Sequence, residues 1–159
     1  MVSLAMVPAV AGAWESPQQA IEAFVAWELG GGRLQTDNEG LARHVHVDPD
    51  YAGMGPDTVM LSDRHRIDAP RCMADSCQVT VRYHLPATDG QEDLPLGNGK
   101  RARTQPVSYT VVSRDGHWRV HSDSLTDLPY VSPAAVQAHQ AGMQDEELQD
   151  EGLQEDQGN

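Results

Sequence analysis

The chain lacks several features that would point directly to a function. No stretch approaches the roughly 20 consecutive apolar residues that a membrane-spanning helix needs, so a membrane span is excluded. Basic residues are few, with 11 lysines and arginines against 24 aspartates and glutamates, and such a chain has no basic field to attract nucleic acid or an anionic membrane. The length predicts one domain, and the negative charge favours a basic partner or serves solubility alone.

The negative charge is concentrated at the C-terminal end of the chain. Residues 144–159 hold seven acidic and no basic residues, whereas the rest of the chain holds 17 acidic and 11 basic residues. Leu148 and Leu153 stand five positions apart, which matches no helical stripe. We therefore expect a folded domain over 14–143 and a disordered acidic tail over 144–159, with a partner-binding tail as the alternative.

The first residues are compatible with an export signal. Residues 2–10 are weakly apolar, and Ala11-Gly12-Ala13 has the small-x-small form that a signal peptidase accepts before Trp14. No lysine or arginine precedes the short apolar run, so we interpret residues 1–13 as a truncated signal peptide, the alternative being no signal at all. The expected location is the bacterial periplasm or the exterior.

Two cysteines support the same compartment. Cys72 and Cys77 are separated by four residues and lie between strand-like segments, which predicts a disulfide across a strand connection. Closing so short a loop contributes about 2 kcal/mol in the chain-entropy model. The alternatives are two reduced thiols, or a zinc site completed by His65 or His84.

Three segments predict helices. A cap at Ser16-Pro17 and apolar residues at three- and four-residue steps predict an amphipathic helix that ends at the glycines of 30–32. A second capping pattern at Thr36 predicts a short helix, and Ser132 caps a small helix that ends near residue 143. The first helix must lie against an apolar surface.

An Asp115-Gly116 turn between two alternating segments predicts a β-hairpin over 107–124. A two-residue turn pairs Arg114 with His117 and places the apolar side chains of both strands on one face. Further strands are expected over 58–69, which is irregular, and over 78–85. The long connection 86–104, rich in glycine and proline, is expected to be mobile.

One face of the predicted sheet is polar and partly basic. If the strand 78–85 pairs beside the hairpin, this face carries Arg82, His84, Arg119, His121 and Asp123. We interpret these residues as a surface for a protein partner. His121 and Asp123, with His84 adjacent, also form the only arrangement that resembles a general base with its orienting carboxylate. No motif predicts a metal site or a cofactor.

The order of elements, together with a terminal strand HWRVHSDSL, resembles the nuclear-transport-factor-2-like superfamily, which includes the SnoaL-type bacterial proteins. The resemblance covers residues 16–125. It implies an α+β fold in which N-terminal helices pack on a curved antiparallel sheet that forms a cone around a pocket. Here the cone would be lined by Phe24, Tyr83, Tyr109 and Trp118. The insertion 86–104 and the helix after Ser132 depart from the pattern.

Members of that superfamily range from isomerases and hydratases to binding modules, so the resemblance alone does not select a function. Our first hypothesis is a non-catalytic exported binding module, in its sharpest form an immunity-type inhibitor of a secreted antibacterial toxin. The alternatives are a SnoaL-type pocket enzyme or binder of a small hydrophobic ligand, and an accessory domain of an envelope assembly.

Overall fold

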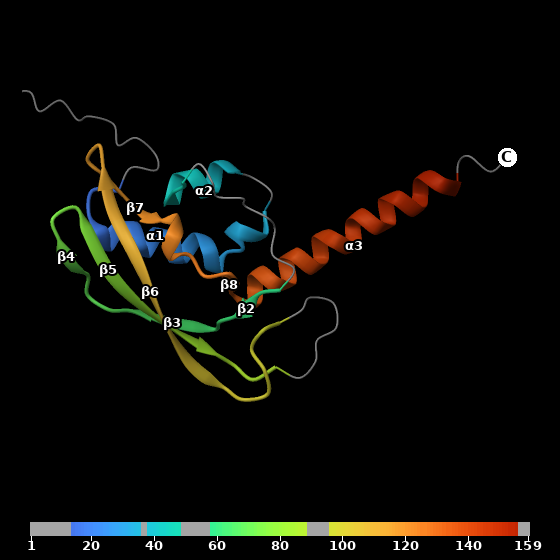
Figure 1. The fold of residues 1–159 in the computed structure, drawn as a ribbon. Helices are drawn as coiled ribbons and strands as arrows, with labels where there is room; N and C mark the ends of the chain where they lie inside the picture. Colours follow the sequence, from blue (N-terminus) through green and yellow to red (C-terminus); the bar gives the residue numbers. More distant parts are fainter. Residues whose placement is uncertain (1–13, 36–37, 49–57, 89–95, 156–159) are drawn as a thin grey trace, which may run out of the picture.

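The computed structural model describes residues 14–35, 38–48, 58–88 and 96–155 of the chain (Figure 1). It is an α+β structure with three α-helices and a mostly antiparallel sheet. Residues 1–13, to which the interpretation as a signal peptide refers, lie outside the described part.

The first helix, α1 (Pro17–Leu29), begins as its sequence predicts. The Ser16 hydroxyl accepts a hydrogen bond from the Gln19 amide, and Pro17 takes the first helical position, where its missing N–H has no cost. The chain then turns into a short 3-10 helix, η1 (Gly32–Leu34), and into α2 (Asn38–His44). The apolar side of α1 packs on the sheet and supplies Ile21 and Phe24 to the main core.

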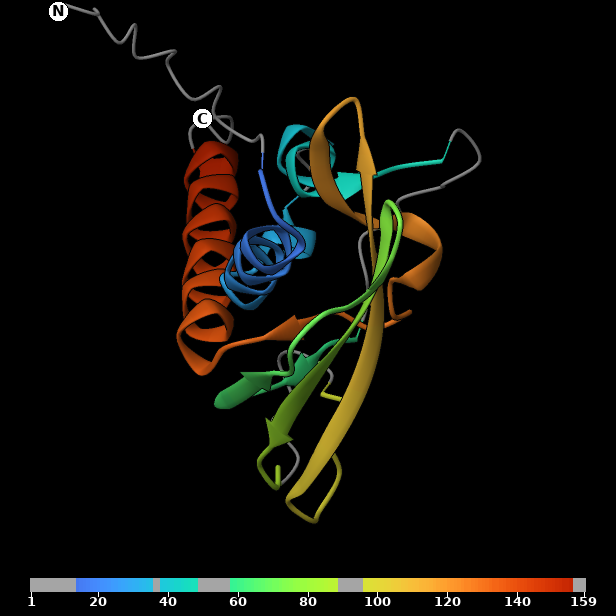
Figure 2. The ribbon, with the colours of Figure 1, turned by 90° about the vertical axis from the view of Figure 1, so that its left-hand side faces the viewer.

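Six strands form the main sheet and two strands form a small parallel pair. In the main sheet the order is β1 (Val45–His46), β7 (His117–His121), β6 (Arg103–Arg114), β5 (Ser76–Leu85) and β3 (Arg64–Ile67), and β4 (Arg71–Met73) also pairs with β5. The small pair is β2 (Met60–Leu61) with β8 (Tyr130–Val131). The three α-helices lie on one side of the main sheet, so that within the described part its other side, called here the outer face, has no helix over it (Figure 2).

The hairpin formed by β6 and β7 confirms the predicted register. Arg114 pairs with His117 and Val111 pairs with Val120, and both turn residues have the positive φ angles (54° at Asp115, 78° at Gly116) that a two-residue turn of this kind requires. The second strand is shorter than predicted, because β7 ends at His121 and residues 122–124 form the 3-10 helix η2 (Ser122–Ser124).

Alternation along β5 is also as predicted, since Val79, Val81, Tyr83 and Leu85 are fully buried. The irregular strand expected over 58–69 is divided between two sheets: its first part, β2, pairs with β8, and its second part, β3, pairs with β5. The two long strands, β5 and β6, are antiparallel neighbours in which Val81 pairs with Val107. The connection between them therefore joins adjacent strands of the sheet.

That connection is held in place where the structure describes it. The Asn98 side chain accepts a hydrogen bond from the Leu61 amide and donates one to the Leu61 carbonyl, each at 2.7 Å, as a neighbouring strand would. Gly97 also donates to the Val59 carbonyl. The expectation of a mobile connection over 86–104 therefore fails at these residues, and residues 89–95 lie outside the described part.

Cys72 and Cys77 face each other across the β4–β5 hairpin, with their sulfur atoms 2.09 Å apart. This is disulfide-bonding distance, as the spacing predicted. The tight turn between them, at residues 74–75, gives Ala74 a positive φ angle of 53°. Such a pair is compatible with an extracellular or periplasmic location.

The last helix, α3 (Pro133–Glu155), corrects two expectations. It does not end near residue 143, and residues 144–155 continue it where we had expected disorder. The physical reason is that a capped start at Ser132, whose hydroxyl accepts from the Ala135 amide, is followed by alanine, glutamine, glutamate and leucine, which favour a helix locally without burial. The C-terminal part of α3 projects away from the other elements (Figure 1).

Candidate functional site

The interior that the resemblance would assign to a pocket is filled by its own side chains. Phe24, Tyr83 and Tyr109 have no exposed surface, the rings of Phe24 and Tyr109 meet edge to face at 5.2 Å, and the two tyrosine hydroxyl groups lie 3.1 Å apart. Trp118, the fourth residue of the expected lining, is partly buried and packs against the same core. A ligand could reach the first three only by displacing them.

An ion pair that the sequence did not reveal lies beside these tyrosines. Glu28 on α1 is completely buried, and its carboxylate accepts from the Arg33 guanidinium of η1, with Nε at 2.9 Å. Arg33 also donates to the Thr126 carbonyl at 2.7 Å and to the Thr126 hydroxyl at 3.1 Å, which attaches the segment before β8 to the first helix. The sequence spacing could have predicted the burial of Glu28. This residue follows Ile21 by seven positions and Phe24 by four, so it lies on the same, buried side of α1.

Burial determines the protonation of this group of side chains. It raises the pKa of Glu28, against which the Arg33 charge acts, and it raises the pKa of Tyr83 and Tyr109 well above the ordinary value for a phenol. The Tyr83 ring also stacks on Tyr130 with centroids 4.0 Å apart. Because these side chains are enclosed, we assign them to stability, and the outer face of the sheet is the place to look for function.

The residues predicted for the polar face do lie on that outer face, but at its two ends. His84 pairs with Thr104 on β6, whereas Val120, next to His121, pairs with Val111 seven residues further along the same strand. At about 3.3 Å per residue this separates His84 from His121 by roughly 20 Å. The expectation that His84 stands beside the His121–Asp123 pair is therefore wrong.

At the end of the outer face that carries Arg82 and His84, each of these two side chains already has an acidic partner. Arg82 pairs with Asp68 at 3.0 Å, and the His84 Nδ1 lies 2.6 Å from the Asp63 carboxylate. The hydrogen bond from His84 lowers the pKa of Asp63. At this end of the face the Arg82 charge is paired with a carboxylate, and the His84 ring is hydrogen-bonded to one.

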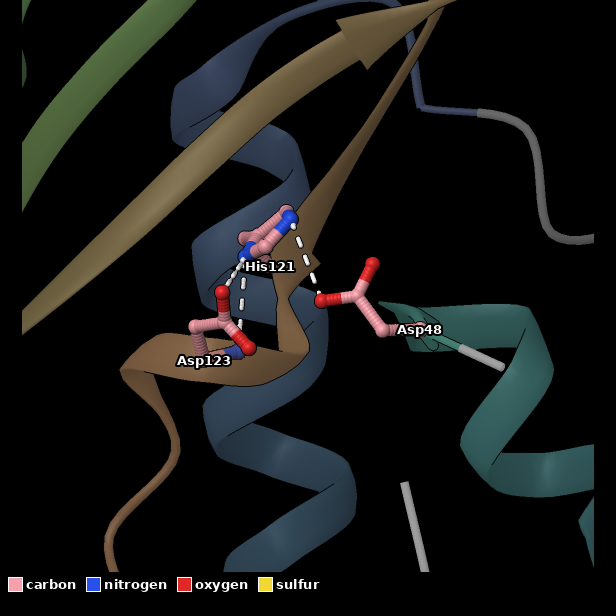
Figure 3. Close-up of side chains that lie close together, drawn as sticks. All are labelled: Asp48, His121 and Asp123. Carbon is pink, nitrogen blue, oxygen red and sulfur yellow. Dashed lines mark hydrogen bonds and ion pairs between the residues drawn. The ribbon is translucent and has the colours of Figure 1, made fainter. Parts of the chain in front are cut away.

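At the second end, His121 lies between two carboxylates (Figure 3). Its Nε2 is 3.8 Å from Asp48, which follows the end of β1 by two residues, and its Nδ1 is 3.7 Å from Asp123. The Asp123 amide donates to the same Nδ1 at 3.3 Å, and the Asp48 amide donates to the Ser122 hydroxyl at 3.1 Å. The start of η2 and the end of β1 thus bring the three side chains together.

In this arrangement the His121 ring links the carboxylates of Asp48 and Asp123, which suits a metal centre or a catalytic site poorly. Asp48, His121 and Asp123 each offer a ligand atom within 4.8 Å of the others. However, the two carboxylates face opposite nitrogens of the ring, and the Asp123 amide already occupies Nδ1, so a single ion could use all three only after rearrangement. No described serine, threonine or cysteine stands in hydrogen-bond contact with a ring nitrogen of His121 as a nucleophile would.

The same end of the face borders a corner formed by Trp14, the end of α2, β1 and β7. His44 is nine-tenths buried between the rings of Trp14 and Trp27, at centroid distances of 5.8 and 5.2 Å. Desolvation, followed by the charges of Arg43 and Arg119, lowers the pKa of His44 to about 4. His46 also has a lowered pKa, chiefly because of desolvation.

No family model and no curated protein matches this chain. Among the helices of the described part, none is both long enough and apolar enough to cross a membrane.

Proposed function

We propose that this protein is a non-catalytic binding module that holds a protein partner on the outer face of its sheet. The observation that carries the proposal is the contrast between the two sides of the sheet. On the inner side Phe24, Tyr83 and Tyr109 leave no exposed surface for a substrate, whereas on the outer side Arg66 and Arg82 have side chains that are 81% and 47% exposed.

The shape of the outer face supports a protein partner. Ser108, Thr110 and Gln78 form a ladder of short polar side chains across β5 and β6, with the Gln78 amide donating to Thr110 at 2.8 Å and the Ser108 hydroxyl donating to Gln78 at 3.2 Å. Arginines stand around this ladder. A broad, polar and arginine-bearing surface of this kind is typical of the patches that proteins use to bind one another.

Export is part of the proposal. The Cys72–Cys77 pair favours an oxidising compartment, and we place the protein in the bacterial periplasm or outside the cell. A fold related to the nuclear-transport-factor-2-like superfamily, with helices on one side of a curved sheet, is consistent with this role. The specific partner that we propose is a secreted antibacterial toxin, which the protein would neutralise as an immunity-type inhibitor. Assembly with other envelope proteins is the alternative.

The test is affinity purification of the tagged protein from the envelope fraction of its own cells, with two matched variants. We expect one near-stoichiometric protein to co-purify with the wild type and with Arg101→Glu, a charge reversal in the exposed loop before β6. Arg82→Glu combined with Arg119→Glu should lose it. A preparation without any protein partner, combined with a thermal shift caused by small hydrophobic compounds, would refute the proposal and support the pocket alternative.

A further inference from the structure

The ring of His44 lies between two tryptophan rings. It stacks on Trp14 at a centroid distance of 5.8 Å and on Trp27 at 5.2 Å, with interplanar angles of 15° and 27°. His44 is the last residue of α2, Trp27 belongs to α1, and Trp14 lies in the segment that precedes α1. The stack therefore joins three separate parts of the chain.

The two tryptophans are held very differently. The Trp27 ring is enclosed, since a Cβ atom added at Gly32 would lie 2.2 Å from it and one added at Gly40 would lie 2.9 Å from it. Besides the stack and its packing at the rim of the core, Trp14 has one backbone contact, in which the Trp118 amide of β7 donates to its carbonyl at 2.9 Å. Trp14 is thus the ring that can leave the stack without the movement of a helix.

Two buried nitrogen atoms of the stack have no hydrogen-bond partner among the described residues. They are the indole Nε1 of Trp14, which can only donate, and the Nδ1 of His44. An unpaired buried donor costs free energy that hydration would restore, so the docked position of Trp14 is weakly stabilised. The unpaired Nδ1 of His44 is tolerable while the imidazole is neutral with its proton on Nε2, because Nδ1 then needs no acceptor.

Protonation of His44 changes this balance. The imidazolium has an N–H at both nitrogens, and the Nδ1 proton would meet no acceptor among the described residues. The charges that act on His44 are the guanidinium groups of Arg43 on α2 and Arg119 on β7, whereas α1 and the segment before it contribute uncharged indole rings to the stack. Desolvation, followed by these two charges, lowers the pKa of His44 to about 4.

We propose that the Trp14 ring is an acid-released latch, which stays closed on the neutral His44 ring and opens when this histidine is protonated. Opening admits water to the His44 ring and to the indole N–H, so both unpaired nitrogens gain partners. It also separates the Trp14 carbonyl from the Trp118 amide and thereby uncovers the edge of β7. The faces of the two indoles attract an imidazolium, and this attraction acts against release. In the proposal it is outweighed by the missing acceptor and by the two arginines.

Linkage gives the direction of the pH dependence. His44 has a lower pKa in the closed state than in the open state, where solvation returns it toward 6.5, so neutral pH favours the closed state. This preference is lost as the pH falls from 6.5 toward about 4. The ratio of open to closed protein should rise roughly 30-fold between about pH 7.5 and about pH 5.

Amide hydrogen exchange in the isolated protein tests the latch, because the Trp14 carbonyl protects the Trp118 amide. Exchange rates are measured by NMR over this pH range and corrected for the intrinsic pH dependence of exchange. We expect the protection of Trp118 to fall roughly 30-fold from neutral pH to about pH 5. Low concentrations of urea should leave it unchanged, since a local opening exposes little surface, whereas Val81, inside the β5–β6 ladder, should lose protection in urea.

Two variants assign the pH dependence to one histidine. His44→Phe keeps an uncharged ring in the stack, and the protection of Trp118 should then no longer fall with pH. His65→Phe, the matched replacement of an exposed histidine on β3, should retain the wild-type fall. A His44→Phe protein that keeps the fall refutes the latch. Where this variant does not fold, the wild-type exchange data alone decide the question.

Two results with the wild type overturn the inference. If the protection of Trp118 depends on urea as steeply as that of Val81, Trp14 leaves only when the whole protein unfolds. If the protection of Trp118 stays constant or rises as the pH falls, the attraction between the indoles and the imidazolium prevails. The experiment needs no partner, so its failure leaves the proposed binding surface intact, and the absence of a partner leaves the latch intact.

Discussion

Replacement of Arg33 by methionine is the strictest test of the interior described above. In the wild type, the Arg33 guanidinium neutralises the fully buried Glu28 carboxylate and donates to Thr126. Methionine keeps much of the side-chain length but removes the charge and every donor. The variant leaves a buried carboxylate without its cation, and it frees the segment before β8 from α1.

The expected loss is large because one partner of a buried ion pair is removed. Such a change typically costs about 3–5 kcal/mol of unfolding free energy, which is a large share of the 5–15 kcal/mol of an ordinary domain. The double variant Glu28→Gln, Arg33→Met should be more stable than Arg33→Met alone, since no charge remains buried. This recovery separates the electrostatic effect from the loss of packing.

Urea denaturation followed by tryptophan fluorescence measures these differences, and pH provides a second test. Burial raises the pKa of Glu28, and removal of Arg33 should raise it further. A carboxyl whose folded pKa lies above its unfolded pKa favours the folded state at low pH, and this contribution is lost as pH rises through the folded pKa. The defect of Arg33→Met should therefore shrink as the pH is lowered from neutral toward the folded-state pKa of Glu28.

The double variant, which has no ionisable group at position 28, should show a much flatter pH dependence. A loss under about 1 kcal/mol for Arg33→Met, or a defect that does not change with pH, would contradict the assignment of Glu28 as a buried carboxylate held by Arg33.

Two further predictions concern local geometry. Joint replacement of Cys72 and Cys77 by alanine should cost about 2 kcal/mol in urea denaturation, and addition of a reductant should bring the wild type to the same stability and leave the variant unchanged. Gly32→Ala should destabilise by about 1–3 kcal/mol, because an added Cβ would lie 2.2 Å from the Trp27 ring, whereas Gly142→Ala on α3, with open space around it, should stabilise by about 0.5–1 kcal/mol. Equal effects at the two glycines in a thermal melt would refute the packing argument.

The part of the fold that sequence predicted well depends on local physics. The Ser16 cap of α1 and the Asp115-Gly116 turn each act within a few residues, so their structures follow from the side chains next to them. Alternation then assigns each residue of β5 to a face, because successive side chains of a strand point to opposite sides. Helix α3 extends further than predicted, because the helix propensity of residues 144–155 acts locally, whereas the prediction of a disordered tail rested on their charge and low apolar content.

The candidate site was likewise predicted only where local physics determines it. The residue types and the face, with Arg82, His84, Arg119 and His121 pointing to the outer side, followed from period-two alternation alone. Their grouping did not, because the distance from His84 to His121 depends on the register between β5, β6 and β7. Asp48 joined the site only because β1 returns to pair beside β7.

By itself, then, the sequence determined which side of each element is buried, where the hairpin turns, and that two cysteines can close a short loop. The tertiary structure alone decided what these surfaces meet: that Glu28 pairs with Arg33 in the interior, that the tyrosines fill the space where a pocket was expected, and that Asp48 lies beside His121. The physical reason is that burial and charge compensation depend on contacts between residues far apart in the chain, and no local pattern specifies those contacts.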